Sequence, residues 1–222
     1  RKEAKRKSKR IEPSTILIGH DRLIYSGLLG NEMCDRRLGA LSIYASPTES
    51  FEVSLAGGPW LRRSAFVIPP FRSHRLRSGT GRILNGCVES ESIDRRQVDA
   101  IVEAFNQGPD RPRRLARLRA ADRDLATGPT YEGFKTAQFD DLTPGETLAP
   151  RAMDKRIVDA INMFRDELDE AALSADNCAR GAGLSTFRFL HLFKEMTDIP
   201  FDRIACGSEP DASWIMPTVQ IA

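Results

Sequence analysis

Short apolar runs alternate with turn-forming residues over roughly the first 90 positions of the chain. The runs lie at residues 16–18, 23–25, 41–44, 66–68 and 83–84. Glycine, proline, serine and asparagine separate them, with glycine-rich turns at 57–58 and 78–81 and a Pro69-Pro70 pair that ends a strand because proline cannot donate to the ladder. This spacing is typical of many short strands, so we predict a β-barrel or sandwich over residues 14–91.

After residue 92 the apolar residues recur at the helical period. Val98, Ile101, Val102 and Phe105 lie at i, i+3, i+4 and i+7 and predict a helix over 93–106. A second helix is expected from about Pro112, with leucines on one face and arginines on the others. The two form a helical hairpin over 92–128 whose apolar stripes make it our candidate dimer contact. The arginines could bind DNA, although a solvated helix face has the same composition.

The next segment, 129–152, is rich in proline and glycine, so we expect a linker. Asp154 is then placed to cap a helix that runs to about Leu168. Ser174 caps a shorter helix that stops near Gly181 or Gly183, and Ser185 caps another. Residues 153–204 are therefore predicted to form a helical module.

The helix after Ser185 carries two stripes at helical spacing. Four apolar residues form the first, which we assign to the core. They are Phe189, Leu192, Phe193 and Met196. The core cannot also bury the second stripe, which we expect to face outward. It consists of Phe187, Leu190, His191 and Lys194. Two short helices, a glycine-containing turn and an outward face are typical of a helix-turn-helix that places its second helix in the major groove of DNA, although an ordinary helical hairpin fits the pattern equally well.

The residues of this segment also resemble the first helix-turn-helix of the AraC/XylS family of transcription regulators. The matching positions are Gly183, Leu184, Ser185, Phe189, Leu192, Phe193, Lys194, Pro200 and Phe201. Asp198 replaces the usual glycine, and the match ends after Ile204. Residues 65–74, AFVIPPFRSH, resemble a turn of cupin-like barrels, which commonly precede this DNA-binding module.

The resemblance and the local charge together suggest DNA contacts. By the family's pattern, Phe187, Leu190 and His191 point into the groove, where they are expected to contact thymine methyls and to form one hydrogen bond to a base. Phosphate contacts are expected from four residues that precede or lie on the second helix. They are Arg180, Thr186, Arg188 and Lys194. The family's module contains two such units, so with the second unmatched we expect an irregular tail at 205–222 and weak binding by this chain alone.

Composition adds few constraints. The 222 residues, 41% hydrophobic and 29% charged, suffice for two globular domains, and residues 1–13 form a basic arm that we expect to be disordered. Neither a membrane-spanning run nor an apolar signal segment is present in the sequence, so we expect a cytoplasmic protein without a membrane partner. The four cysteines form no CxxC pair, and we expect them to be small buried hydrophobic residues.

Catalytic chemistry has little support in the sequence. The three histidines stand at positions 20, 74 and 191 without an HxH pair, so we expect neither metal nor cofactor, and a structural role for His74 is favoured over a ligand role. The predicted fold class is α+β: a cupin-like barrel, a helical hairpin and an incomplete helix-turn-helix module. The expected function is a homodimeric, sequence-specific DNA-binding regulator that responds to an unknown small-molecule effector. A metal-dependent cupin-type enzyme, or a truncated regulator acting only through dimerisation, remain alternatives.

Overall fold

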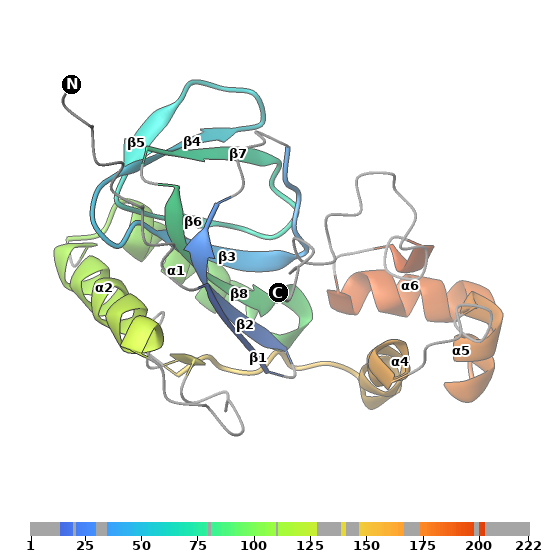
Figure 1. The fold of residues 1–222 in the computed structure, drawn as a ribbon. Helices are drawn as coiled ribbons and strands as arrows, with labels where there is room; N and C mark the ends of the chain where they lie inside the picture. Colours follow the sequence, from blue (N-terminus) through green and yellow to red (C-terminus); the bar gives the residue numbers. More distant parts are fainter. Residues whose placement is uncertain are drawn as a thin grey trace, which may run out of the picture.

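A computed structural model describes residues 14–19, 21–29, 35–79, 81–109, 111–127, 139–140, 147–166, 174–197 and 200–202. Several sequence predictions lie outside these residues: the arm at 1–13, most of the linker, Asp198 and the tail at 205–222. Within them, two β-sheets and two helices are stacked in layers, and three further helices lie beside this stack (Figure 1). The α+β prediction is confirmed.

All strand pairs in the two sheets are antiparallel. The five-stranded sheet contains, in spatial order, β1 (Thr15–Ile18), β2 (Arg22–Leu28), β8 (Arg82–Glu89), β3 (Ala40–Ala45) and β6 (Ala65–Ile68). The three-stranded sheet contains β5 (Leu61–Arg63), β4 (Phe51–Leu55) and β7 (His74–Ser78). Two antiparallel sheets packed face to face are the arrangement of cupin-like double-sheet folds.

The alternation of side chains along β3 shows how the layers form. Leu41 and Ile43 point to the face of the five-stranded sheet that the helices cover, whereas Tyr44 points to the three-stranded sheet. Because successive side chains of a strand point to opposite faces, one strand contributes to both cores. Phe51 and Val53 of β4 pack against Tyr44 from the other sheet.

Helices α1 (Arg95–Asn106) and α2 (Arg111–Thr127) cover the five-stranded sheet. Asp94 caps α1 by accepting from the Arg96 backbone N–H at 2.9 Å. Ile101 and Leu118 are buried in the chain's own core. These two residues of the stripes that suggested a dimer contact are therefore occupied within the chain, and the dimer itself remains a prediction.

Part of the stretch predicted as a linker packs onto the same core. Phe139 and Leu148 are buried there, and the Asp140 carboxylate pairs with the buried Arg22 guanidinium at 3.1 Å. On the same face of the sheet, Arg82 lies 3.6 Å from Asp122 of α2. Phe139, Asp140 and Leu148 are thus integral to the core between the five-stranded sheet and the helices, because their apolar and charged side chains have buried partners.

A third core joins the three remaining helices. They are α4 (Lys155–Asp166), α5 (Ala175–Gly181) and α6 (Thr186–Thr197). Ile157 and Ile161 of α4 pack with Cys178 of α5 and with Phe189 and Phe193 of α6. Asp154 caps α4 as predicted, accepting from the Arg156 backbone N–H at 3.0 Å. Near the barrel, α6 lies against η1 (Ser90–Ser92), a short helix after β8.

Candidate functional site

The turn between α5 and α6 has the local chemistry that its sequence predicts. Ser174 caps α5 by accepting from the Asn177 N–H at 3.2 Å. Gly183 adopts φ +64°, the left-handed conformation that ends the helix, and a Cβ added there would meet nothing within 4 Å. Glycine is therefore needed for its backbone conformation and not for space.

Two side chains fix the start of α6. The Ser185 hydroxyl accepts from the Arg188 backbone N–H at 3.4 Å, so it is the predicted cap. The Thr186 hydroxyl donates to the Asp176 carboxylate of α5 at 2.6 Å. This bond ties the two helices together, and Thr186 would have to release it to donate to a phosphate.

One face of α6 is packed. Phe189 and Phe193 are fully buried, with ring centroids 5.8 Å apart, and each meets Phe201 edge-on at 5.3 Å. Such tilted and edge-to-face contacts are favourable because the positive ring edge meets the negative ring face. Leu192 and Met196 complete this face as partly buried residues. The predicted core stripe is confirmed.

The neighbouring face of α6 is open to solvent. Phe187 is 79% exposed and Leu190 is 38% exposed, and His191 is exposed with its ring centroid 6.0 Å from that of Phe187. These side chains form the exposed face of α6. Their predicted exposure is confirmed, and their contact with bases remains a prediction.

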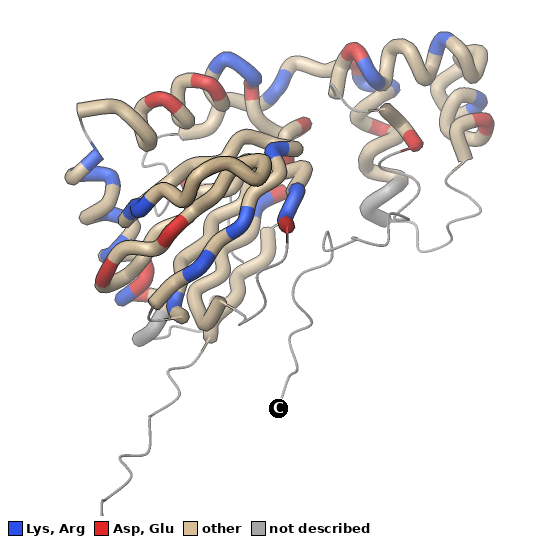
Figure 2. The backbone as a smooth tube through the Cα atoms, turned by 90° about the horizontal axis from the view of Figure 1, so that it is seen from above, with Lys and Arg blue, Asp and Glu red and all other residues tan. Residues whose placement is uncertain are grey.

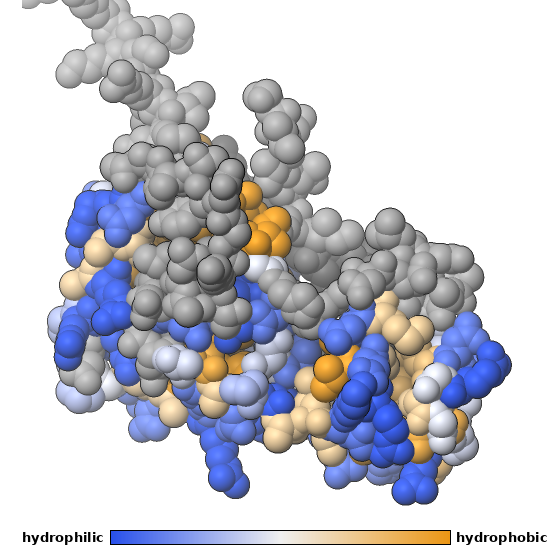
Figure 3. All heavy atoms as spheres, turned by 90° about the horizontal axis from the view of Figure 1, so that it is seen from below, coloured by the Kyte–Doolittle hydropathy of each residue, from blue (hydrophilic) through white to orange (hydrophobic). Residues whose placement is uncertain are grey.

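The predicted phosphate contacts surround this face. Arg188 and Lys194 are exposed, as is the acidic Glu195. Arg180 is also exposed but donates to the Asn177 side chain at 3.1 Å. On the region formed by α4, α5 and α6, hydrophobic and hydrophilic side chains lie next to each other (Figure 3). Such a surface offers both apolar and cationic contacts.

The interior between the two sheets holds a polar pair centred on His74. Its Nδ1 lies 2.9 Å from the Arg72 carbonyl oxygen and its Nε2 lies 3.1 Å from the Tyr44 hydroxyl. Burial lowers the pKa of His74, which keeps the imidazole neutral. A carbonyl can only accept, so Nδ1 carries the proton and Nε2 accepts from Tyr44.

This arrangement gives His74 a structural role. Tyr44 is also buried, and burial raises the pKa of its phenol far above its ordinary value, so the hydroxyl keeps the proton that it donates. The lone pair that a metal would need is therefore already used. Among the residues that the structure describes, no group of three or more His, Cys, Asp or Glu side chains could hold a metal ion. His20, Cys34 and Cys206 lie outside those residues.

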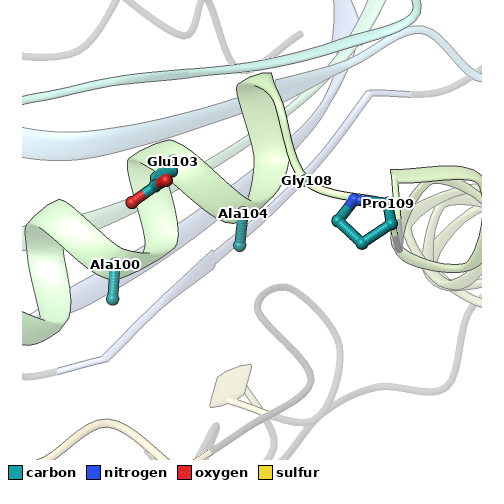
Figure 4. A pocket seen from close by; sticks show the side chains of 5 residues that line it. All are labelled: Ala100, Glu103, Ala104, Gly108 and Pro109. Atoms are coloured by element: carbon teal, nitrogen blue, oxygen red, sulfur yellow. The ribbon is translucent and has the colours of Figure 1, made fainter.

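The surface hollow on α1 offers little chemistry. It is lined by Ala100, Glu103, Ala104, Gly108 and Pro109 (Figure 4). Glu103 is the one ionisable side chain in this lining, and small apolar groups form the rest. Over the described part of the chain, none of the helices is both long enough and apolar enough to cross a membrane.

Comparison with known proteins does not assign the chain to a family. No family model matches, and no curated protein matches. Among solved structures, KdgF from Halomonas sp. has 19% identity over 34% of this chain and 78% of its own, with a TM-score of 0.30. An RmlC-like cupin from Shewanella frigidimarina has 15% identity over 34% of this chain and 74% of its own, with a TM-score of 0.28.

A longer alignment is found with an apo variant of ToxT from Vibrio cholerae. It covers 85% of this chain and 98% of that protein, at 8% identity and a TM-score of 0.26. Values this low identify neither a family nor an activity. The assignment of function therefore depends on the residues of the chain itself.

Proposed function

We propose that the chain is a cytoplasmic, sequence-specific DNA-binding transcription regulator that reads bases with the exposed face of α6. The supporting observation is the contrast between two phenylalanines of one helix: Phe193 is fully buried, whereas Phe187 is 79% exposed. Large apolar side chains grouped on a surface are typical of interaction sites, because their exposure to water is unfavourable. Leu190 lies on the same face and extends the apolar contact.

The chemistry of this face suits the major groove. Phe187 and Leu190 can pack against the C5-methyl group of thymine, which only this groove displays. His191 can donate to, or accept from, the edge of a base. Arg188 and Lys194 lie on the same helix, where they would neutralise flanking phosphates and fix the orientation of α6.

The remaining parts of the chain have roles that follow from the AraC/XylS resemblance. In this proposal the two-sheet barrel is the sensor for a small-molecule effector, and the active form is a homodimer. The hydrogen bond between Tyr44 and His74 supports a non-catalytic barrel, because it uses the histidine atom that a metal would need. No catalytic residue is part of the proposal.

The test is binding to a DNA duplex selected from a random pool at low ionic strength. Phe187→Ala removes the most exposed apolar side chain of the exposed face of α6. The matched control is Met163→Ala, which removes an apolar side chain on α4 that is 40% exposed. We expect the first change to weaken binding by roughly 5-fold to 100-fold, as the loss of one base contact does, and the control to bind like the wild type. Equal affinities of the two variants would show that α6 does not read DNA.

A further inference from the structure

The outer face of the three-stranded sheet concentrates positive charge. Arg62 of β5 and Arg77 of β7 lie opposite Glu52 of β4 in the strand register, and Arg75 lies opposite Ser54. We call these three arginines, with the neighbouring Trp60, the basic sheet face. The side chains alternate along each strand, so Val53 and Leu76 point inward, into the core between the two sheets. The arginines are thus placed on the outside by the same pattern that builds the core.

The charge of this region is unusual for the chain. Residues 35–79, which hold this sheet together with β3 and β6 of the other sheet, contain seven arginines and three carboxylates, an excess of four positive charges, whereas the whole chain has a net charge of +2. This stretch contains no lysine. The guanidinium group of arginine offers paired N–H donors that match phosphate oxygens, so arginines favour phosphate over a simple diffuse attraction. Two of the three arginines also have a carboxylate neighbour, Glu52 at 2.6 Å from Arg77 and Asp35 at 3.4 Å from Arg75, and a phosphate would compete with these carboxylates.

The arginine side chains are held in place before any partner binds. The guanidinium carbon of Arg77 lies 4.3 Å from the centre of the Trp60 ring, and that of Arg75 lies 5.8 Å from it. Arg77 also donates to Glu52 at 2.6 Å, and Arg62 donates to the neutral hydroxyl of Ser50. Cation–π and hydrogen-bond contacts of this kind reduce the side-chain entropy lost on binding.

Among the residues that the structure describes, no helix covers this face. Helices α1 and α2 cover the opposite sheet, and α4, α5 and α6 lie beside the barrel (Figures 1 and 2). Seen from above, lysine and arginine positions recur along the strands of the barrel (Figure 2). Arg75 and Arg77 keep 36% and 45% of their side-chain surface exposed despite their contacts.

We propose that the basic sheet face binds backbone phosphates of the DNA duplex that α6 holds. This inference rests on the proposed function. In this proposal the duplex held by α6 continues along the barrel, where its phosphates reach a high effective concentration at the basic sheet face, so contacts that are weak alone add to the affinity. Such contacts carry no sequence information but increase the salt dependence of binding.

The experiment compares two triple variants of the full chain that remove the same charge. Arg62→Gln, Arg75→Gln and Arg77→Gln neutralise the basic sheet face. Arg96→Gln, Arg111→Gln and Arg113→Gln neutralise three exposed arginines of α1 and α2 as the control. Affinity for a 40-base-pair duplex is measured between about 50 and 200 mM salt, with a thermal melt of each variant to verify folding.

The slope of log K against log salt gives the number of phosphates contacted. We expect it to become shallower by about 2 to 3 for the sheet variant, since each lost phosphate contact removes about 0.9, and to change by less than about 1 for the control. If the sheet variant melts early, Arg62→Gln alone is used, with an expected change of about 1. Equal slopes for both triple variants would overturn the inference.

Two further measurements distinguish a failed sheet contact from a failed DNA-binding function and from a lipid partner. An unchanged slope in the sheet variant, together with lost binding in an Arg188→Gln, Lys194→Gln variant, would reject the sheet contact while leaving the proposed function standing. Unchanged binding in both would reject both. Vesicles containing phosphatidylserine provide the second measurement: if the sheet variant loses only vesicle binding and keeps its DNA slope, the partner is a lipid surface and our inference is wrong.

Discussion

Replacement of Phe193 by alanine tests whether the two faces of α6 are assigned correctly. Phe193 is fully buried and its ring contacts Phe189 and Phe201 at centroid distances of 5.8 and 5.3 Å. Truncation of a buried phenylalanine costs about 3 to 5 kcal/mol, because apolar contacts are lost and a cavity remains. Phe187→Ala on the exposed face is the matched control, with an expected cost within about 0.5 kcal/mol.

The assay should report on this helical unit alone, since the barrel has separate cores. Cys178 of α5 is buried in the same core as Phe193, and burial raises the pKa of its thiol, so it is protected from alkylation until the unit opens. Mass spectrometry identifies labelling of Cys178 separately from the other cysteines. We expect Phe193→Ala to accelerate labelling by roughly 100-fold or more, and Phe187→Ala to leave it within about twofold. Similar rates for the two variants would refute the assignment of faces.

Two other predictions concern the barrel. Asp140→Ala should lower the free energy of unfolding by about 3 kcal/mol, because it removes a buried partner of Arg22. Asp99→Ala on the exposed side of α1 should change it by less than about 0.5 kcal/mol. Equal thermal melts of the two variants would show that the buried ion pair is unimportant. Burial lowers the pKa of His74, so below pH 6.5 the unfolded chain binds a proton more readily than the folded chain, and stability falls as the pH falls. His74→Gln should reduce this loss of stability between melts at pH 7 and pH 5. An unchanged pH dependence would contradict the buried, neutral His74.

The parts of the fold that the sequence predicts are those with strong local signals. Asp154 and Ser174 cap helices where their short polar side chains indicate, and Gly183 ends α5 in the left-handed conformation. The contrast between Phe187 and Phe193 follows from helical periodicity alone. These features depend on residues within two turns of one another, so one sequence is sufficient to find them.

Contacts between distant residues could not be predicted in this way. Arg22 and Asp140 are separated by 118 positions, and neither stands in a pattern that marks it as buried. Phe139 and Leu148 are isolated apolar residues in a segment rich in proline and glycine, so the segment resembled a linker. Strand β4 forms no apolar run, because Phe51 and Val53 alternate with polar residues; its signal in the sequence is the period-two alternation itself.

The measurement that tests the central claim most directly is a change of base preference caused by one residue of α6. His191→Arg places a guanidinium group, which prefers the O6 and N7 atoms of guanine, at a position that we assign to the groove. Duplexes are selected from a random pool with the wild type, with this variant, and with Met163→Arg on α4 as the control. Our account predicts that one position of the enriched sequence shifts to guanine for His191→Arg only. Identical enriched sequences for all three proteins, or no enrichment by the wild type, would contradict it.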